Sequence, residues 1–426
     1  MTATRPDAAE GTFDLMDERL LRDPFTGYSR IREQTPITRV TIPGIAPPWV
    51  VTRHEDVRAV LADPRFVTNP ANVPGGAGVN LAEMVLRSRG VAEEHIRYLL
   101  ANILEFDGAD HHRLRRLVSR AFTARRVELL RPRIEQIAED LLDRLPGAVR
   151  DDAVDLLRHF AYPLPVVVIC ELVGIPAQDR PGWQRASAAL VEPSGAGMAE
   201  ALRELVESTE RVIAARRAEP ADDLVSALIR AQDEDGDRLS DTELIAMVLT
   251  LLIAGHETTA HLIGNGTAAL LTHPDQLARL RDEPELMPGA VPELLRWCGP
   301  ATATRMRYAT EDLRVGDVPI RRGEAVMPIL VAANFDPRAF DDPDRLDLGR
   351  DRDGHRERHV AFAHGLHYCL GAPLARLEGE VAFGALLRRF PDLTLAVAPD
   401  ELDRELVPGA WRLRALPVRL GGQRIG

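Results

Sequence analysis

Residues 362–371 read FAHGLHYCLG, and residues 372–378 continue as APLARLE. One cysteine, Cys369, lies among glycines and histidines, directly before a segment whose apolar residues recur at helical spacing. The proline of that segment suits a first helical turn, where its missing N–H group costs nothing. We therefore expect Cys369 at a helix N-terminus, where backbone N–H groups and the helix dipole favour a thiolate. Gly365 and Gly371 would allow the backbone to approach a flat or bulky group closely.

Three interpretations of this cysteine are open from the loop alone. A free cysteine is often a small buried hydrophobe. His364, His367 and Cys369 could belong to a zinc site, although their spacing is tight and no fourth ligand follows nearby. A single thiolate presented in this way is also how a protein holds haem iron for O–O bond cleavage.

The loop resembles a known family. Phe362, Gly365, Cys369 and Gly371 reproduce the pattern F-x-x-G-x-x-x-C-x-G of the cytochrome P-450 family, the haem-thiolate monooxygenases. The resemblance extends from about residue 20 to the C-terminus and is to soluble bacterial members, in particular actinobacterial secondary-metabolite hydroxylases. It implies that Cys369 is the metal ligand and binds the iron of haem b, with the other three residues also contacting this cofactor.

The chain of 426 residues can bury a large core, and no stretch has the composition of a flexible linker. Helical patterns fill the middle of the chain, whereas strand patterns lie near both ends, at 37–40, 49–52, 304–309, 313–315, 318–320 and 325–329. With the resemblance, these patterns predict a mainly α fold with small β-sheets and a long central helix over the haem. We expect a flexible N-terminal segment, 1–20, and a single haem-binding domain, 21–426.

The long helix is predicted from its ends. Ser240 and Glu243 form a capping box, and the helix that they start runs to about Thr272. At 1.5 Å per residue such a helix is about 48 Å long. Its middle, residues 254–259, reads AGHETT. A glycine lowers helix stability, and a charged residue inside an apolar helix is unfavourable unless it is paired or has a function. Neighbouring threonines can bond back to helix carbonyls, so a simple kink is the alternative interpretation.

The same six residues carry the second resemblance. A-G-x-E-T is the oxygen-activation motif of the family, which implies that Thr258 hydrogen-bonds the dioxygen and that Glu257 passes protons to it through water. It also implies that Ala254 and Gly255 face the substrate beside the cofactor. A zinc-protease motif is excluded, because His261 follows the first histidine by five residues and lies about 140° around the helix from it.

Four side chains are candidates for binding the haem propionates. His111 and Arg115 are four residues apart and share one face of a predicted helix, where they could also be an ordinary surface pair. The family has H-x-x-x-R at this place, and the resemblance assigns both residues to a propionate. It assigns Arg307 and His367 in the same way, although Arg307 could also be an exposed strand arginine. Buried propionates need such cationic donors.

Further motifs concern folding rather than chemistry. Glu293 and Arg296 match the E-x-x-R pair of the family, which implies a buried structural ion pair behind the thiolate. Phe335 replaces an arginine that is usual in the family, which puts one contact of the following loop in doubt. Ala363 replaces a usual glycine, and we expect a local adjustment of the backbone there.

The net charge of −12 argues against nucleic acid as a partner, because binding phosphates needs a basic surface. No nucleotide-binding fingerprint follows a predicted strand, so electrons must come from another protein. The resemblance implies a ferredoxin and a ferredoxin reductase. The arginine-rich stretch 113–126, with Arg376, is the predicted docking surface for an acidic partner, although it could be only a solvated helix face.

The beginning of the chain is polar and carries no apolar run, and the longest apolar stretch is short for a bilayer. Three cysteines far apart suit a reducing compartment. We therefore expect a cytoplasmic protein without a membrane anchor.

The predicted reaction inserts one oxygen atom of O₂ into a C–H bond or an alkene of a lipophilic small molecule, such as a polyketide, macrolide, terpenoid or steroid. Two alternatives stay open. A peroxide-driven haem-thiolate enzyme is disfavoured by Glu257 and Thr258, because such an enzyme has less need of a proton relay. The other alternative is a haem-binding sensor or carrier without catalysis.

Overall fold

The computed structural model describes residues 13–76, 80–191, 195, 197–234, 239–350 and 358–421. These residues are mainly helical with small sheets, as predicted. Most of the segment predicted to be flexible, 1–20, lies outside the described residues. Its described end contains strand β1 (Phe13–Asp14) and the start of helix α1 (Glu18–Arg22), and the flexibility of the segment stays a prediction.

The chain divides into two compact units. Unit 1 comprises Met1–Gly78, Pro292–Cys369 and Arg404–Arg412, and unit 2 comprises Val79–Val291, Leu370–Asp403 and Leu413–Gly426. The single domain expected over 21–426 stays a prediction.

Unit 1 is built on a six-stranded sheet with the strand order β1-β2-β3-β9-β6-β4. Its central pair, β3 and β9, is parallel and joins two distant parts of the sequence, with Trp49 opposite Val326. The predicted strand 304–309 is shorter in the structure, because only its last three residues pair with neighbours. The strands of this sheet, besides β1, are β2 (Ile37–Thr41), β3 (Trp49–Val51), β4 (Phe66–Val67), β6 (Arg307–Ala309) and β9 (Ala325–Pro328).

Shorter elements complete unit 1. They are the helices α1, α2 (Pro24–Gln34), α3 (His54–Ala62) and α17 (Leu330–Asn334), the 3₁₀ turns η1 (Pro70–Asn72) and η4 (Gly365–His367), the hairpin β7 (Leu313–Val315) and β8 (Val318–Ile320), and the pair β11 (Arg404–Glu405) and β12 (Arg412–Leu413). The second residue of β12, Leu413, is assigned to unit 2. Helix α16 (Met287–Cys298) begins in unit 2 and ends in unit 1.

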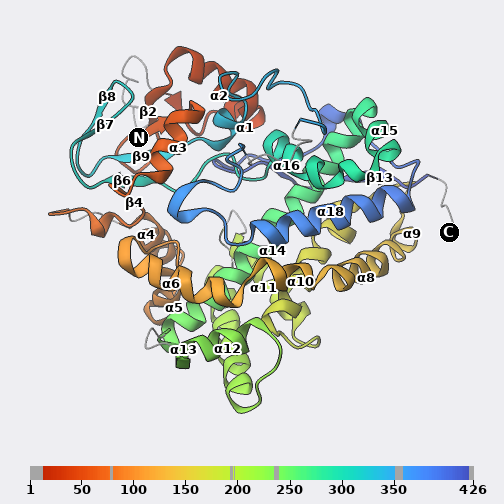
Figure 1. Cartoon of the computed structure of the whole chain (residues 1–426), viewed down its shortest axis with the longest axis horizontal. Helices are drawn as coiled ribbons and strands as arrows, with labels where there is room; N and C mark the ends of the chain where they lie inside the picture. The colour runs from red at the N-terminus through yellow and green to blue at the C-terminus, as the bar shows by residue number, and fades with distance from the viewer. Residues whose placement is uncertain are drawn as a thin grey trace, which may run out of the picture. The chain divides into compact units, whose positions relative to one another are not determined.

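Unit 2 is a bundle of helices around α14 (Asp241–Thr272), which is the predicted long helix. The predicted capping box is confirmed, because the Ser240 hydroxyl accepts from the Glu243 N–H and the Glu243 carboxylate accepts from the Ser240 N–H. Figure 1 shows α14 (green) within this bundle, and α8 (Arg131–Leu142) beside α18 (Ala372–Arg389), with which it packs.

The remaining elements of unit 2 are α4 (Leu81–Ser88), α5 (Glu93–Leu100), α6 (Gly108–Ala121), α7 (Ala124–Glu128), α9 (Leu145–Ala148), β5 (Val154–Asp155), the π-helical turn η2 (Leu157–Ala161), α10 (Pro163–Val173), α11 (Arg180–Val191), α12 (Met198–Ala218), α13 (Leu224–Glu234), α15 (Pro274–Asp282), η3 (Pro284–Leu286), β10 (Thr394–Leu395), η5 (Pro399–Glu401) and β13 (Pro417–Arg419). Strands β10, β13 and β5 form a small sheet.

Helix α14 is long and apolar enough to cross a membrane by length and composition, which differs from the expectation that no apolar stretch is long enough. Two-thirds of its most apolar window (67%) is nevertheless buried. That burial is typical of a helix at the centre of a folded bundle.

Candidate functional site

Cys369 is the last residue of a turn that is closed by backbone hydrogen bonds. The Cys369 N–H donates to the carbonyl of Phe362 over 3.0 Å, and the Tyr368 N–H donates to the carbonyl of Gly365 over 3.0 Å. Helix α18 begins three residues after the cysteine, with a proline in its first turn, as predicted. Main-chain hydrogen bonds therefore hold the backbone of the cysteine in place.

Gly365 is required by two separate features. Its φ of +71° is a conformation that L side chains rarely adopt, and an added Cβ atom would lie 2.5 Å from the carbonyl oxygen of Leu61 in α3. The backbone at Gly365 therefore approaches α3 closely, and its predicted approach to a flat or bulky group stays a prediction. Gly371 differs, because its φ of −80° is open to any residue. The backbone conformation therefore does not require a glycine at this position.

Ala363 has a φ of +61°, so this alanine occupies the left-handed conformation that usually belongs to glycine. Left-handed backbone costs an L residue roughly 1–2 kcal/mol. The adjustment expected at this position is thus a strained backbone that keeps the path of the loop, with the methyl group packed against the apolar core of unit 1.

The three cysteines differ in burial. Cys170 and Cys298 are buried, and burial raises the pKa of each thiol to about 12, so both stay neutral thiols. Cys369 is only half-buried. Within the described ranges, no group of three or more His, Cys, Asp or Glu side chains could hold a metal ion. The zinc site considered for His364, His367 and Cys369 therefore has no support in the geometry.

Glu293 and Arg296 form the buried ion pair that was predicted. Two hydrogen bonds join the guanidinium to the carboxylate, at 2.7 and 2.8 Å, and the side chains are only 1% and 3% exposed. Arg296 also donates to the carbonyls of Asn334 and Pro343, and Glu293 accepts from Arg350. This network ties α16 to the irregular chain that follows α17.

Phe335, which replaces an arginine usual in the family, is buried in an aromatic cluster. Its ring centre lies 5.2 Å from that of Phe25 and 5.3 Å from that of Trp297. The Arg296 guanidinium lies 5.2 Å from the ring centre. The contact that was in doubt is thus replaced by aromatic and cation–π packing.

The AGHETT segment lies within the continuous helix α14. Ala254 and Thr258 are exposed, Gly255 is half-buried and Glu257 is buried. The Thr258 hydroxyl donates to the carbonyl of Ala254 over 3.1 Å, the predicted back-bond. His256 is buried, its imidazole donates to the carbonyl of Leu252, and burial lowers its pKa, so it is neutral.

The four candidate propionate ligands lie on three elements. His111 and Arg115 lie on α6 one turn apart, and His111 is only 1% exposed, so the pair is not an ordinary surface pair. Arg307 lies in β6 and is 5% exposed, which excludes an exposed strand arginine. His367 lies in η4, in the same loop as Phe362, Gly365 and Cys369, and is half-buried.

Two features of unit 2 escaped the sequence interpretation. Glu378 is fully buried in α18, although the apolar residues around it at helical spacing could have drawn attention to it. The Tyr162 hydroxyl is 2.8 Å from Nε2 of His261, which joins the residue after η2 to α14. No local pattern in the sequence signals this second contact.

Comparisons with known proteins agree with the motifs. A family model described as Cytochrome P450 matches residues 187–404. The chain is 46% identical over 406 residues to cytochrome P450 107B1 of Saccharopolyspora erythraea, covering 95% of this chain and 97% of the relative. It is 41% identical over 419 residues to 6-deoxyerythronolide B hydroxylase of the same organism, covering 96% and 99%.

Solved structures give the same result for the fold. The Bacillus subtilis bacillaene polyketide synthase cytochrome P450 PksS matches with a TM-score of 0.86 and 38% identity, covering 96% of this chain and 100% of that chain.

Proposed function

The chain belongs to the cytochrome P450 family of monooxygenases, and from this we propose that Cys369 ligates the iron of haem b in an enzyme that oxygenates a lipophilic polyketide. The observation that carries the proposal is the contrast among the cysteines. Cys170 and Cys298 are buried neutral thiols, whereas Cys369 is half-buried and held by its backbone at a helix start.

The residues present fit a haem group. The left-handed turn at Gly365 and Ala363 shapes the backbone before the thiolate, and His111, Arg115, Arg307 and His367 are the cationic candidates for the two propionates. When bound, the haem supplies the activation of dioxygen and the oxygen transfer, which protein side chains cannot perform.

Residues of α14 would handle the protons. Thr258 is exposed on the helix surface and its hydroxyl can both donate and accept. Glu257 is buried beside it, where a carboxyl can take up and release a proton within a water-poor site. Ala254 is exposed on the helix, and its small side chain is consistent with a bulky substrate beside it. Gly255 lies instead against Ile169 of α10, whose side chain an added Cβ atom would meet at 3.0 Å.

The substrate class comes from the relatives. One relative is named as a hydroxylase of 6-deoxyerythronolide B and a neighbour as part of a polyketide synthase system. We propose hydroxylation or epoxidation of a polyketide or macrolide by this chain, in secondary metabolism such as antibiotic biosynthesis. The test is incubation of the holoenzyme with ferredoxin, reductase, isotopically labelled dioxygen and a panel of polyketides and macrolides that includes 6-deoxyerythronolide B. A labelled product supports the proposed substrate class, and the absence of product from every member of the panel contradicts it.

The thiolate is tested by the carbon monoxide difference spectrum of the reduced protein. We expect a strongly red-shifted Soret band that Cys369→Ser abolishes. Cys170→Ser and Cys298→Ser are matched controls that keep the band, because both residues are core thiols. A band that survives Cys369→Ser in folded protein would reject the ligand assignment.

The electron donor is proposed to be a ferredoxin that docks on the arginine-rich stretch 113–126. Part of its positive charge is used within the chain, because Arg113 pairs with Glu243 and Arg126 with Asp222. Arg125 is exposed and makes no ion pair with the residues that the structure describes. It is thus the arginine best able to meet an acidic partner.

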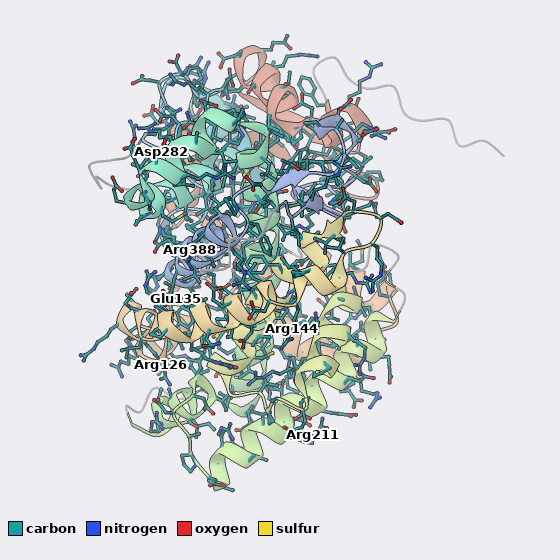
Figure 2. All side chains as sticks on the ribbon, turned by 90° about the vertical axis from the view of Figure 1, so that its right-hand side faces the viewer. Arg126, Glu135, Arg144, Arg211, Asp282 and Arg388 are labelled. Atoms are coloured by element: carbon teal, nitrogen blue, oxygen red, sulfur yellow. The ribbon has the colours of Figure 1, made fainter. Side chains whose placement is uncertain are left out.

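A pair of charge reversals tests the docking surface. Figure 2 labels Arg126 and Arg144 toward opposite ends of the α7–α8 stretch, with Glu135 between them. Arg125→Glu should slow the reduction of the haem by ferredoxin and make the rate of reduction depend less on salt concentration. Arg144→Glu should change neither. Equal rates for the two variants would remove the proposed surface.

A cytoplasmic location is part of the proposal and is consistent with three free cysteines.

A further inference from the structure

A pocket lies between α11 and α12 in unit 2 and is partly open to solvent. Its volume is about 280 Å³. Pockets that bind drug-sized ligands measure about 300–1,000 Å³, so a ligand of this pocket is smaller than a typical drug. None of the residues assigned above to the haem, to proton handling or to the docking surface lines it. The proposed reaction therefore does not account for the pocket.

The floor of the pocket is held by a buried hydrogen bond between the two helices. The indole N–H of Trp183 on α11 donates to the hydroxyl of Ser208 on α12 over 2.9 Å, and both side chains are buried. Ala186 and Leu205, which also line the pocket, are buried as well. Since the indole N–H is already bonded, the floor offers an incoming molecule chiefly apolar surface. The pocket is therefore preformed and has an apolar base.

Charged side chains of both signs surround this floor, and each helix contributes both signs. Asp179 directly precedes α11 and Arg185 lies on it, whereas Glu204 and Arg211 lie on α12. Asp179 is half-buried and the other three side chains are exposed. Figure 2 labels Arg211 at the surface of the helical bundle. Guanidinium and carboxylate groups from both helices therefore line the same pocket.

The charges of these four side chains are not used within the part of the chain that the structure describes. None of the four forms an ion pair there, whereas other charged residues of the same helices do. The pairs are Arg180 with Glu171, Arg203 with Glu200 and Glu207, and Arg217 with Asp241. A charged ligand in the pocket would therefore meet groups that no internal partner holds away from it.

Gly182 leaves part of the pocket empty. It lies in the first turn of α11 and lines the pocket without a side chain. Beyond its chain neighbours and its own helix backbone, an added Cβ atom would have one described heavy atom within 4 Å, Nη2 of Arg185 at 4.0 Å. That atom is the end of a flexible side chain, so a larger residue fits at this position. A side chain added there would block the pocket while every charge around it is kept.

We propose that the pocket binds a small zwitterion, an α-amino acid with an apolar side chain. The carboxylate of the ligand binds a guanidinium, that of Arg185 or Arg211. Its ammonium group binds a carboxylate, that of Asp179 or Glu204. Its apolar side chain covers the floor of the pocket. A ligand that carries one sign of charge only would lie beside like charges that repel it. The proposal does not depend on the proposed function.

The first test is fluorine NMR of the holoenzyme labelled with fluorotryptophan, with L-leucine as the probe. Of the four tryptophans of the chain, Trp183 is the one in unit 2 and at this pocket. Its resonance is identified by its loss in Trp183→Phe. L-Leucine should shift this resonance saturably and leave the other three unchanged. A Trp183 resonance that does not move up to millimolar L-leucine overturns the proposal.

The second test separates the two charges of the ligand. Isoamylamine keeps the apolar group of leucine and the positive charge, whereas isocaproate keeps the apolar group and the negative charge. We expect each to bind about five- to tenfold more weakly than L-leucine, because each lacks one charged contact. Binding of either analogue as tightly as L-leucine would overturn the assignment to a zwitterion.

The third test uses variants of the pocket, with thermal unfolding and the carbon monoxide band as checks that each is folded. Arg185→Gln combined with Arg211→Gln should weaken binding of L-leucine by about tenfold or more. Gly182→Leu should abolish the shift of the Trp183 resonance. Arg217→Gln is the matched control on α12, because Arg217 pairs with Asp241 outside the pocket, and it should bind as the unchanged protein does. Unchanged binding in the folded pocket variants would overturn the proposal.

Discussion

Replacing Gly365 by alanine should lower the free energy of unfolding by more than the same replacement does in an ordinary turn. The backbone φ of +71° costs an L residue roughly 1–2 kcal/mol. The added Cβ also meets backbone atoms of α3, at 2.5 Å from the Leu61 oxygen and 2.9 Å from the Ala62 Cα, and overpacking costs about 1–3 kcal/mol. Alanine recovers about 0.4–1 kcal/mol by restricting the unfolded chain. We expect a net loss of about 2–4 kcal/mol in the free energy of unfolding.

Gly323→Ala is the matched control in the same unit. Gly323 has a φ of +83°, but nothing lies within 4 Å of its added Cβ. Only the backbone cost remains, so we expect a loss of about 1 kcal/mol or less. Urea unfolding of both variants, followed by far-UV circular dichroism, measures the difference. Losses that agree within about 0.5 kcal/mol would refute the argument that contact with α3 fixes this glycine, since that margin is the usual size of independent surface effects.

Three further outcomes are expected. Arg296→Ala should cost about 3–5 kcal/mol in urea unfolding, because it leaves a buried carboxylate and several carbonyls without their donor, and a loss under about 1 kcal/mol would contradict this. Phe335→Ala should cost about 3–5 kcal/mol in the same assay, since it empties the centre of an aromatic cluster, whereas a near-neutral result would mean that the site collapses. Alkylation of haem-free protein at pH 8 should modify Cys369 alone. The pKa of about 12 keeps Cys170 and Cys298 as unreactive thiols until the pH approaches that value, so their modification in folded protein would contradict their burial.

The sequence predicted those elements whose ends carry their own signals. The capping box at Ser240 and the proline at 274 mark both ends of α14 within one residue of the structure. The strands at 37–40 and 49–52 are confirmed as β2 and β3, because alternation and flanking turns are local properties. The predicted strand at 304–309 was longer than the observed one, because the length of a strand depends on which neighbouring strands pair with it.

Site features that depend on distant chain could not be predicted in the same way. The motif around Cys369 predicted that the backbone at Gly365 approaches a flat or bulky group, and it gave no sign that the backbone of α3 lies against this glycine. Phe335 in place of the usual arginine put one contact of the following loop in doubt, and the structure shows that rings from other parts of the chain pack against it. Glu378 was predicted only as part of a helix, because the apolar residues beside it indicate one buried face and do not show that distant parts of the chain cover the acid as well.

The parallel pairing of β3 with β9 has a consequence for synthesis on the ribosome. About 270 residues separate the end of β3 from the start of β9. At about 5–20 residues per second, roughly 14–55 s pass before the partner strand is made. During that interval one edge of β3 is unpaired, and an unpaired strand edge is a template for association with other chains. Nascent chains that end before β9 should therefore depend on chaperones to stay monomeric, and truncated forms lacking it should aggregate through this edge.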